Sequence, residues 1–361
     1  MTPAPGRIAA LTGLRGISIA LVVAAHAHVQ HLSAGLFGVD VFFVLSGFLI
    51  THVLLDLAPF GARRWRFFLG RRAARLLPAL AVTLLALAAW VLLTDVPLGG
   101  RCLALASSHA MDLPIGPATQ CRGPFHITWS LAAEEQFYLV WPALVLLLSR
   151  LPARAAALSC VAAYLGCWAV ADLVAHVAPH AAGWWNFFPA GRPSALLLGA
   201  ALAFVVPLRG RRPAMDPLTV RLAVPVFVGG FVLTGLLLAS DGPPRQVLLG
   251  PLVAVPATLL VTALVLAPAG TGAMLCRHPA LVWLGEISYC LYLVHALALH
   301  VLRDLRHDDS MTTNAIGVGV ALLAAWGLHR LVEQPLRRTG YAWIGRRERM
   351  PEPVRAPTLV G

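Results

Sequence analysis

The chain has 361 residues, of which 58% are hydrophobic and only 12% are charged, and its mean hydropathy is +0.76. A soluble domain carries about 25% charged residues, so this composition excludes an ordinary soluble protein, and it is too apolar for a disordered one. The basic side chains are all arginines apart from histidine, and they lie between long apolar runs, where membrane topology explains them better than nucleic-acid binding does. We therefore expect a protein of the lipid bilayer with no nucleic-acid partner.

Apolar segments of about the length that crosses a bilayer recur ten times along the chain. They cover residues 8–28, 34–55, 76–94, 129–149, 155–176, 192–206, 218–239, 246–267, 281–302 and 312–332. The sixth is short and begins with Arg192 and Pro193. The sequence predicts an all-α, polytopic integral membrane protein of about ten transmembrane helices, with one membrane domain over residues 1–340 and a basic, disordered tail over residues 341–361.

The arginines are distributed unequally between the two ends of these segments. With alternating directions, 21 arginines fall on one side and 6 on the other, while Arg15 lies inside the first segment. Cytoplasmic loops carry such an excess, so we expect both termini in the cytoplasm and a multi-pass protein of the plasma membrane. The alternative for the first segment is a cleaved signal peptide ending at Ala25-His26-Ala27, but Arg15 interrupts the uncharged core that such a peptide needs.

The six cysteines form no C-x-x-C pair, so neither a zinc site nor a thioredoxin-like site is indicated, and no metal is expected. Cys102 and Cys121 flank one loop between predicted spans. They form a disulfide if that loop faces an oxidising compartment, and two free thiols are the equally weighted alternative.

Ionisable residues within the predicted spans need a function or a partner, because a charged side chain deep in hydrocarbon costs about 2.5–3.5 kcal/mol on insertion scales. Arg15 and His26 are eleven residues apart, which returns to nearly the same helix face roughly 16 Å along the axis. Topology puts Asp40, Glu134 and Glu135 near the depth of His26. A histidine beside a carboxylate is a common general base. We take His26 and these three carboxylates as the candidate catalytic group.

A second group of ionisable residues lies toward the cytoplasmic side, where Arg15 is joined by Arg71, Arg72 and Arg75. The planar guanidinium binds phosphate bidentately, so these arginines predict an anionic ligand that enters from the cytoplasm. The alternative for residues 71–75 is a topogenic anchor.

Polar residues on the predicted spans complete the candidate site. The candidates for substrate binding are Ser46, Tyr289, Tyr292, His295 and Arg192. Tyr289, Tyr292 and His295 are alternatively ordinary helix-interface polar groups. The carboxylates Asp40, Glu134 and Glu135 are alternatively interfacial residues or partners of Arg122 and Arg192.

Six segments, taken in order, resemble the membrane-bound acyltransferase-3 family. They are LTGLRG at 11–16 followed by His26, FFVLSGFLI at 42–50, RRAARLLP at 71–78, WSLAAEEQFYL at 129–139, GEISYCLYLVH at 285–295 and EQPL at 333–336. Their order and spacing agree over about residues 8–340. Thr12 stands where the family usually has Asp, so any role of that acid is absent here.

The resemblance implies acyl transfer from acyl-CoA, with acetyl-CoA foremost, to a hydroxyl of a sugar, a glycoside or a macrolide-type natural product. The family's Arg and His map onto Arg15 and His26. His26 would abstract the acceptor proton while a nearby carboxylate orients it, and Arg15 and Arg75 would hold the donor; whether His26 is instead acylated stays open. Polysaccharide-modifying members often carry a C-terminal hydrolase-like domain, whereas only an arginine-rich tail follows residue 340, so we expect a stand-alone member.

Two other function classes fit parts of the pattern. A transporter or flippase for a lipid-linked sugar also has many spans and buried charges. A non-catalytic sensor or scaffold fits the composition, but it would not need Arg15 and His26 on one helix face.

Overall fold

The structure is a computed structural model that describes residues 5–57, 62–94, 99–113, 121, 123–177, 191–208, 215–239 and 246–348. Its elements, in chain order, are α1 (Pro5–His26), η1 (Ser33–Phe37), α2 (Gly38–Asp56), α3 (Ala62–Thr94), α4 (Gly99–Ser107), η2 (Gly123–Phe125), α6 (Thr128–Leu148), α7 (Ala153–Val177), η3 (Arg192–Ser194), α9 (Ala195–Val205), α10 (Pro217–Ala239), α11 (Gln246–Leu266), α12 (Thr271–Cys276), α13 (Pro279–Glu286), α14 (Ser288–Arg306), α15 (Met311–Leu328), η4 (His329–Glu333) and α16 (Gln334–Glu348).

The predicted all-α membrane fold is confirmed. Within the described ranges the chain forms helices and no strand. Eight helices there are long and apolar enough to cross a membrane, and α13 and α14 together pass the same test as a pair that is bent by 74°. The segment Arg192–Val205 is a shorter apolar helix. These elements correspond in order to the ten predicted segments, and the sixth is the short one.

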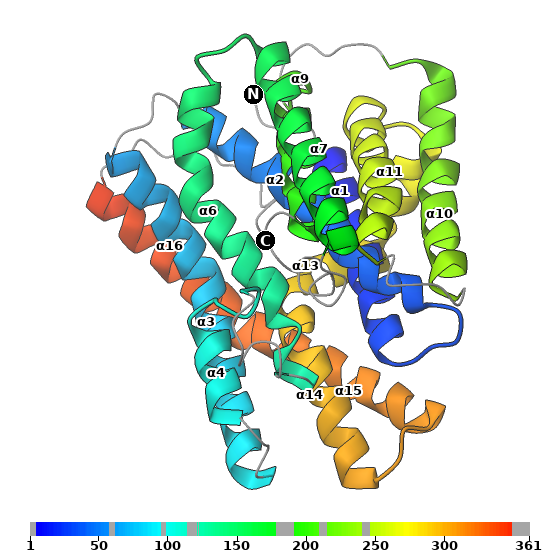
Figure 1. The fold of residues 1–361 in the computed structure, drawn as a ribbon. Helices are drawn as coiled ribbons and strands as arrows, with labels where there is room; N and C mark the ends of the chain where they lie inside the picture. The colour runs from blue at the N-terminus through cyan, green and yellow to red at the C-terminus, as the bar shows by residue number, and fades with distance from the viewer. Residues whose placement is uncertain are drawn as a thin grey trace.

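Two helix ends differ from the prediction. Helix α3 begins at Ala62 rather than at residue 76, and α16 continues to Glu348, so the predicted tail is helical at its start. Residues 349–361 lie outside the described residues. Alanine, leucine and arginine favour helix, but an arginine-rich helix is not apolar enough for a hydropathy pattern to include it. The extensions of α3 and α16 lie side by side (Figure 1).

Close helix packing sets the framework around α1 and α2. Helix α1 packs against α2, α13 and α14, and its Leu14 and Ile19 are fully buried. Helices α2 and α9 meet at two glycines: a Cβ on Gly47 or on Gly199 would lie 1.9 Å from a backbone oxygen of the facing helix. These two glycines therefore act as packing notches between α2 and α9.

The two cysteines that flank one loop are bonded to each other. A disulfide joins Cys102 of α4 to Cys121, with their Cα atoms 5.5 Å apart. Of the two alternatives that the sequence left open, the bridged one is found. It ties α4 to the segment that leads into α6.

Candidate active site

Side chains from five helices line a cavity of about 100 Å³, which we call the arginine cavity. Its apolar wall comes mainly from α2, including Phe42 and Phe43. Its polar lining comes from α1, α2, α3, α6 and α14 and consists of Arg15, Ser46, Arg72, Arg75, Ser130, Glu134, Tyr138, Ser288, Tyr289 and Tyr292. Most of the predicted site residues are therefore brought together around one space.

Three guanidinium groups converge on this cavity. Arg15 donates from Nη2 to Ser288 Oγ at 2.9 Å, and the guanidinium of Arg72 lies 3.6 Å from the ring centre of Tyr138. The Nε atoms of Arg15, Arg72 and Arg75 are all buried and have no hydrogen-bond partner among the described residues. Buried donors are normally paired, so these three are suited to an anionic ligand that supplies the missing acceptors.

Arg71, the fourth arginine predicted to bind the anionic ligand, does not line the arginine cavity. Its guanidinium packs over the rings of Phe67 and Tyr341, at 5.1 Å and 4.3 Å from their centres. It therefore contributes to the interface between α3 and α16 and does not line the arginine cavity. Arg71 and Arg75 are four residues apart and so start from the same face of α3, but the ring contacts of Arg71 direct its guanidinium to α16, whereas Arg75 lines the cavity.

Glu134 is the carboxylate of the arginine cavity. Its Oε1 accepts a hydrogen bond from Ser46 Oγ at 2.8 Å, and its Oε2 accepts one from the Tyr138 hydroxyl at 2.8 Å. Glu135, the next residue on α6, is half-buried and lies outside the cavity lining. One carboxylate thus faces three guanidinium groups, which leaves the cavity with an excess of positive charge.

Asp40 is held by Arg192 rather than by His26. Arg192 donates from Nε to Asp40 Oδ2 at 3.0 Å and also from Nη2, and the same Nη2 donates to the Leu36 carbonyl at 2.9 Å. The Asp40 side chain is 1% exposed and that of Arg192 is 9% exposed. The two predicted site residues therefore neutralise each other, as the alternative interpretation had it, on the side of α2 that faces α9.

His26 ends α1, and its ring is fixed by its own helix. Nδ1 lies 2.9 Å from the Val22 carbonyl oxygen, so Nδ1–H donates and Nε2 keeps its lone pair. Asp40 and Glu134 direct their carboxylate hydrogen bonds to Arg192 and to Ser46 and Tyr138, so the Val22 carbonyl is the group that orients this ring. An orienting role for Glu135 stays a prediction. The direction in which a side chain points around its helix depends on packing.

The predicted stripe on α1 is confirmed, and it faces α14. Arg15 contacts Ser288 near the start of α14, whereas the rings of His26 and His295 meet edge to face with their centres 4.9 Å apart. His26 lies beyond the residues that line the arginine cavity. Tyr292, which lines the cavity, packs beside His295 with ring centres 5.6 Å apart. Ring contacts through Tyr292 and His295 therefore connect the cavity lining to His26.

The tyrosines of α14 are anchored through their hydroxyl groups. Tyr289 donates to the Leu76 carbonyl at 2.8 Å, and Tyr292 donates to the Ile127 carbonyl at 2.9 Å and lies 2.7 Å from Ser130 Oγ. These bonds join α14 to α3 and to the start of α6, so both rings keep a fixed position at the cavity wall.

His295 is fully buried one turn beyond Tyr292. Its Nδ1 lies 2.8 Å from the Tyr292 carbonyl and 3.1 Å from the Leu291 carbonyl. Its Nε2 is buried and has no hydrogen-bond partner among the described residues. His295 therefore presents an unused acceptor in the neighbourhood of His26.

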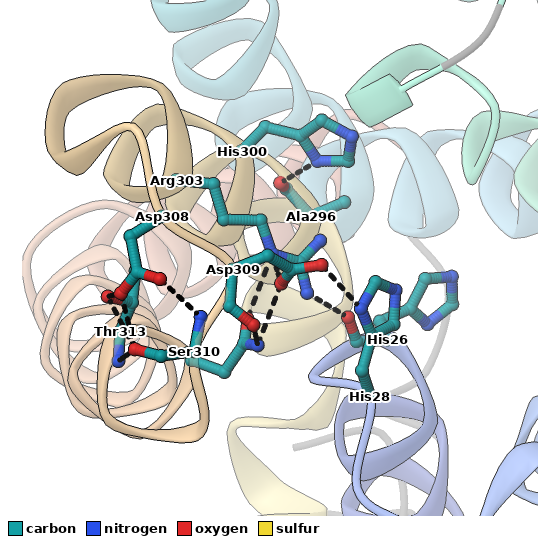
Figure 2. A network of polar contacts seen from close by, with 10 residues as sticks. His26, His28, Ala296, His300, Arg303, Asp308, Asp309, Ser310 and Thr313 are labelled. Atoms are coloured by element: carbon teal, nitrogen blue, oxygen red, sulfur yellow. Dashed lines mark hydrogen bonds and ion pairs between the residues drawn. The ribbon is translucent and has the colours of Figure 1, made fainter.

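Sequence reasoning missed a polar network at the His26 end of α1 (Figure 2). Arg303 of α14 donates from Nη2 to the His26 carbonyl oxygen at 2.8 Å and pairs through Nε with Asp309 Oδ1 at 2.8 Å. Asp309 Oδ2 in turn lies 2.9 Å from His28 Nδ1, and Asn314 contacts both Arg303 and Asp309. The only available signal was the Asp-Asp-Ser run at 308–310, which is typical of a helix start.

A second buried cluster was also missed. His329 Nδ1 and Cys290 Sγ both contact Glu333 Oε2, at 2.8 Å and 3.1 Å, and Gln334 Nε2 lies 2.8 Å from His329 Nε2. His329 and Glu333 bound a single π-helical turn, a feature that is frequent at functional sites. Cys290, His329 and Glu333 bring three possible metal ligands within 4.8 Å of one another. Hydrogen bonds occupy Cys290 Sγ, His329 Nδ1 and Glu333 Oε2, whereas the buried Glu333 Oε1 has no hydrogen-bond partner among the described residues.

Residues 8–330 match a sequence family that is described as an acyltransferase domain. The peptidoglycan O-acetyltransferase OatA of Listeria monocytogenes is 26% identical over 92% of this chain and 56% of its own length. The Bacillus subtilis protein YrhL, provisionally named a peptidoglycan O-acetyltransferase, is 28% identical over 94% of this chain and 56% of its own length. The chain thus spans about half the length of these relatives, and no solved structure gives a significant match.

Proposed function

Because this chain belongs to the acyltransferase-3 family, we propose that it is a membrane-bound O-acetyltransferase that moves an acetyl group from acetyl-CoA to a hydroxyl of a saccharide-type acceptor. The observation that carries the proposal is the arginine cavity, in which three buried guanidinium groups keep an Nε donor without a partner. Such an arrangement suits a polyanionic donor, and ring contacts through Tyr292 and His295 connect it to the His26 imidazole.

The donor is proposed to enter from the cytoplasm, with both termini on that side. The arginine bias supports this orientation. The disulfide between Cys102 and Cys121 agrees with it, because disulfides persist in oxidising compartments and the orientation puts this pair on the opposite side. Arg15, Arg72 and Arg75 would then bind the phosphates or carbonyls of the donor, while its acyl end extends past Tyr292 toward His26.

In the proposed reaction, His26 Nε2 takes the proton of the acceptor hydroxyl. The resulting oxygen attacks the thioester carbonyl carbon, a C–O bond forms, and the C–S bond breaks. The leaving thiolate receives the proton from the His26 imidazolium, so the ring returns to its neutral state. The bond from Nδ1 to the Val22 carbonyl supports this role, because it leaves the lone pair on Nε2.

The acceptor is proposed to be a saccharide hydroxyl, because the two relatives described above are named for peptidoglycan O-acetylation. The match to this chain covers 56% of the length of each of them. A glycoside or macrolide-type acceptor uses the same hydroxyl chemistry and remains an outcome of the test. A transporter or flippase of lipid-linked sugar finds no support among these relatives, whose names describe acetyl transfer.

The test uses purified protein in detergent, radiolabelled acetyl-CoA, and a panel of acceptors that includes muropeptides, simple glycosides and macrolides. We expect label on an acceptor oxygen without any membrane gradient. His26→Ala should lower turnover by about 10²- to 10⁴-fold, the range of general-base catalysis. His31→Ala, an exposed histidine of the following turn, is the matched control.

Two outcomes would contradict the proposal. One is the absence of labelled acceptor across the panel in protein that binds acetyl-CoA. The other is near-normal turnover by a folded His26→Ala variant, which would remove the proposed base.

A further inference from the structure

The polar network at the His26 end of α1 connects that helix to the hairpin of α14 and α15 at two points. Arg303 Nη2 donates to the carbonyl oxygen of His26, and the His28 side chain bonds Asp309 in the loop between α14 and α15. Figure 2 shows both contacts converging on Arg303 and Asp309. The two attachment points on the α1 side flank a single residue, Ala27.

This connection matters because a helix terminus is its least stable part. The last carbonyls of a helix have no partner within the helix, and its carboxyl end carries a partial negative charge. Residue 28 leaves the helix with a φ of 54°, a left-handed conformation that histidine adopts rarely. Arg303 brings both a hydrogen-bond donor and a positive charge to this end.

Arg303 is itself held in place from the other side. Its Nε lies 2.8 Å from Asp309 Oδ1 and 2.9 Å from Asn314 Oδ1, and the Asn314 amide donates to Asp309 Oδ1 at 2.9 Å. Asn314 is 3% exposed and sits in the first turn of α15, which Ser310 caps. The hydrogen bond from Asn314, reinforced by Arg303, keeps the pKa of Asp309 below its usual range, so this carboxylate is charged at neutral pH.

We propose that Arg303 and Asp309 are positioning residues for His26 and form a hairpin clamp that sets where the imidazole stands; the inference rests on the proposed function. The His26 ring is hydrogen-bonded through Nδ1 to the Val22 carbonyl within the last turn of α1, so the backbone of that turn determines the position of Nε2. The clamp holds this backbone at the His26 carbonyl oxygen. Without it, the last turn frays and the base moves away from the thioester.

Displacement of a reacting group by about 1 Å can lower a rate by about 100-fold. We therefore expect Arg303→Gln and Asp309→Asn to lower kcat by between about tenfold and 100-fold. The KM for acetyl-CoA should stay unchanged, because the arginine cavity lies at the other end of the α1 stripe. Arg303→Lys should recover part of the activity, since an ammonium can still cap the carbonyl but cannot reach Asp309 and Asn314 together.

The matched controls are Arg306→Gln and Asp304→Asn, which are exposed residues in the last turn of the same helix. Thermal unfolding in detergent should show all variants folded. Hydrogen exchange should show faster exchange of the amides of residues 23–28 in Arg303→Gln, and no change there in Arg306→Gln.

The outcomes separate the inference from the proposed function. Wild-type protein without any acetyl transfer overturns the proposed function, and the exchange measurement then still tests the clamp. A transferring wild type whose Arg303→Gln and Arg306→Gln variants have the same kcat overturns the clamp. A fall in kcat that merely follows the loss of folded protein also overturns it.

Discussion

In the arginine cavity, the Nε atoms of Arg15, Arg72 and Arg75 have no hydrogen-bond partner among the described residues, whereas Arg192 and Arg303 each donate from both Nε and Nη2. Arg192 and Arg303 also form direct ion pairs, with Asp40 and Asp309 respectively, whereas the three cavity arginines share the single carboxylate of Glu134. All five side chains are buried or half-buried, but their neighbours differ.

This difference separates two uses of the same side chain. A buried guanidinium with satisfied donors joins helices, as Arg192 joins η3 to α2. A buried guanidinium with an unused donor carries a penalty of about 1–3 kcal/mol that only a ligand or water can offset. The arginine cavity is therefore the region where stability is given up for binding, and the paired arginines are the regions where removal should destabilise the fold.

The largest expected effect on stability is at Asp40. Asp40→Asn leaves Arg192 buried without its counter-charge, and removing one partner of a buried pair costs about 3–5 kcal/mol in the free energy of unfolding. Thermal unfolding of the purified protein measures it. In the double variant Asp40→Asn with Arg192→Gln, the loss should be smaller because no charge remains buried.

A loss below about 1 kcal/mol for Asp40→Asn would mean that this pair behaves like an exposed one. Arg192 would then not be an arginine that stabilises the fold. The contrast between the arginines in ion pairs and the cavity arginines with an unused Nε donor would fail at its strongest example.

The second prediction is that a substitution at Arg75, unlike one at Asp40, does not lower thermal stability. Arg75→Gln removes a buried charge that lies near Arg15, so thermal stability should stay the same or rise, while the KM for acetyl-CoA rises by about 10- to 100-fold through loss of a charge-assisted hydrogen bond. Arg71→Gln, one turn away on α3 and outside the cavity lining, is the matched control with little change in KM. A destabilised Arg75→Gln variant with normal KM would place Arg75 among the structural arginines.

The fold was largely predictable because the length of an apolar run is a local property. All ten predicted segments coincide with helices, including the short one at Arg192 and the one that bends between α13 and α14. The start of α3 at Ala62 and the end of α16 at Glu348 were missed, because arginine-rich helix is invisible to a hydropathy pattern.

For the site, the sequence predicted which residues share a helix face but not which neighbour each side chain contacts. Eleven residues make about three turns, so Arg15 and His26 share a face, and both do contact α14. The partner of Asp40 was not fixed by depth, since a residue at the right level can point to either side of α2. In the hairpin clamp, Arg303 is 277 positions from His26 and Asp309 is 281 positions from His28. No local sequence pattern encodes contacts between residues so far apart.

A third, smaller effect concerns His295, which packs between Tyr292 of the arginine cavity and His26. If its unused Nε2 accepts a hydrogen bond from protonated His26, losing that bond should cost about tenfold in kcat. His295→Gln, whose amide reaches the place of Nε2, should keep more activity than His295→Asn, whose amide takes the place of Nδ1. The opposite order would show that only the Nδ1 bonds to the Leu291 and Tyr292 carbonyls matter.

The smallest effect is the pH dependence of the hairpin clamp. Asp309 has a lowered pKa in the folded protein, so its contribution to stability is present above the unfolded value of about 4 and is lost as pH falls through the folded value. The carboxylate is largely exposed, so the change should stay below about 1 kcal/mol. Wild-type protein should therefore lose slightly more thermal stability than Asp309→Asn between about pH 5 and pH 3. Equal losses would mean that the ion pair with Arg303 adds no stability, and that Arg303, like the cavity arginines, keeps its charge for a purpose other than holding the fold together.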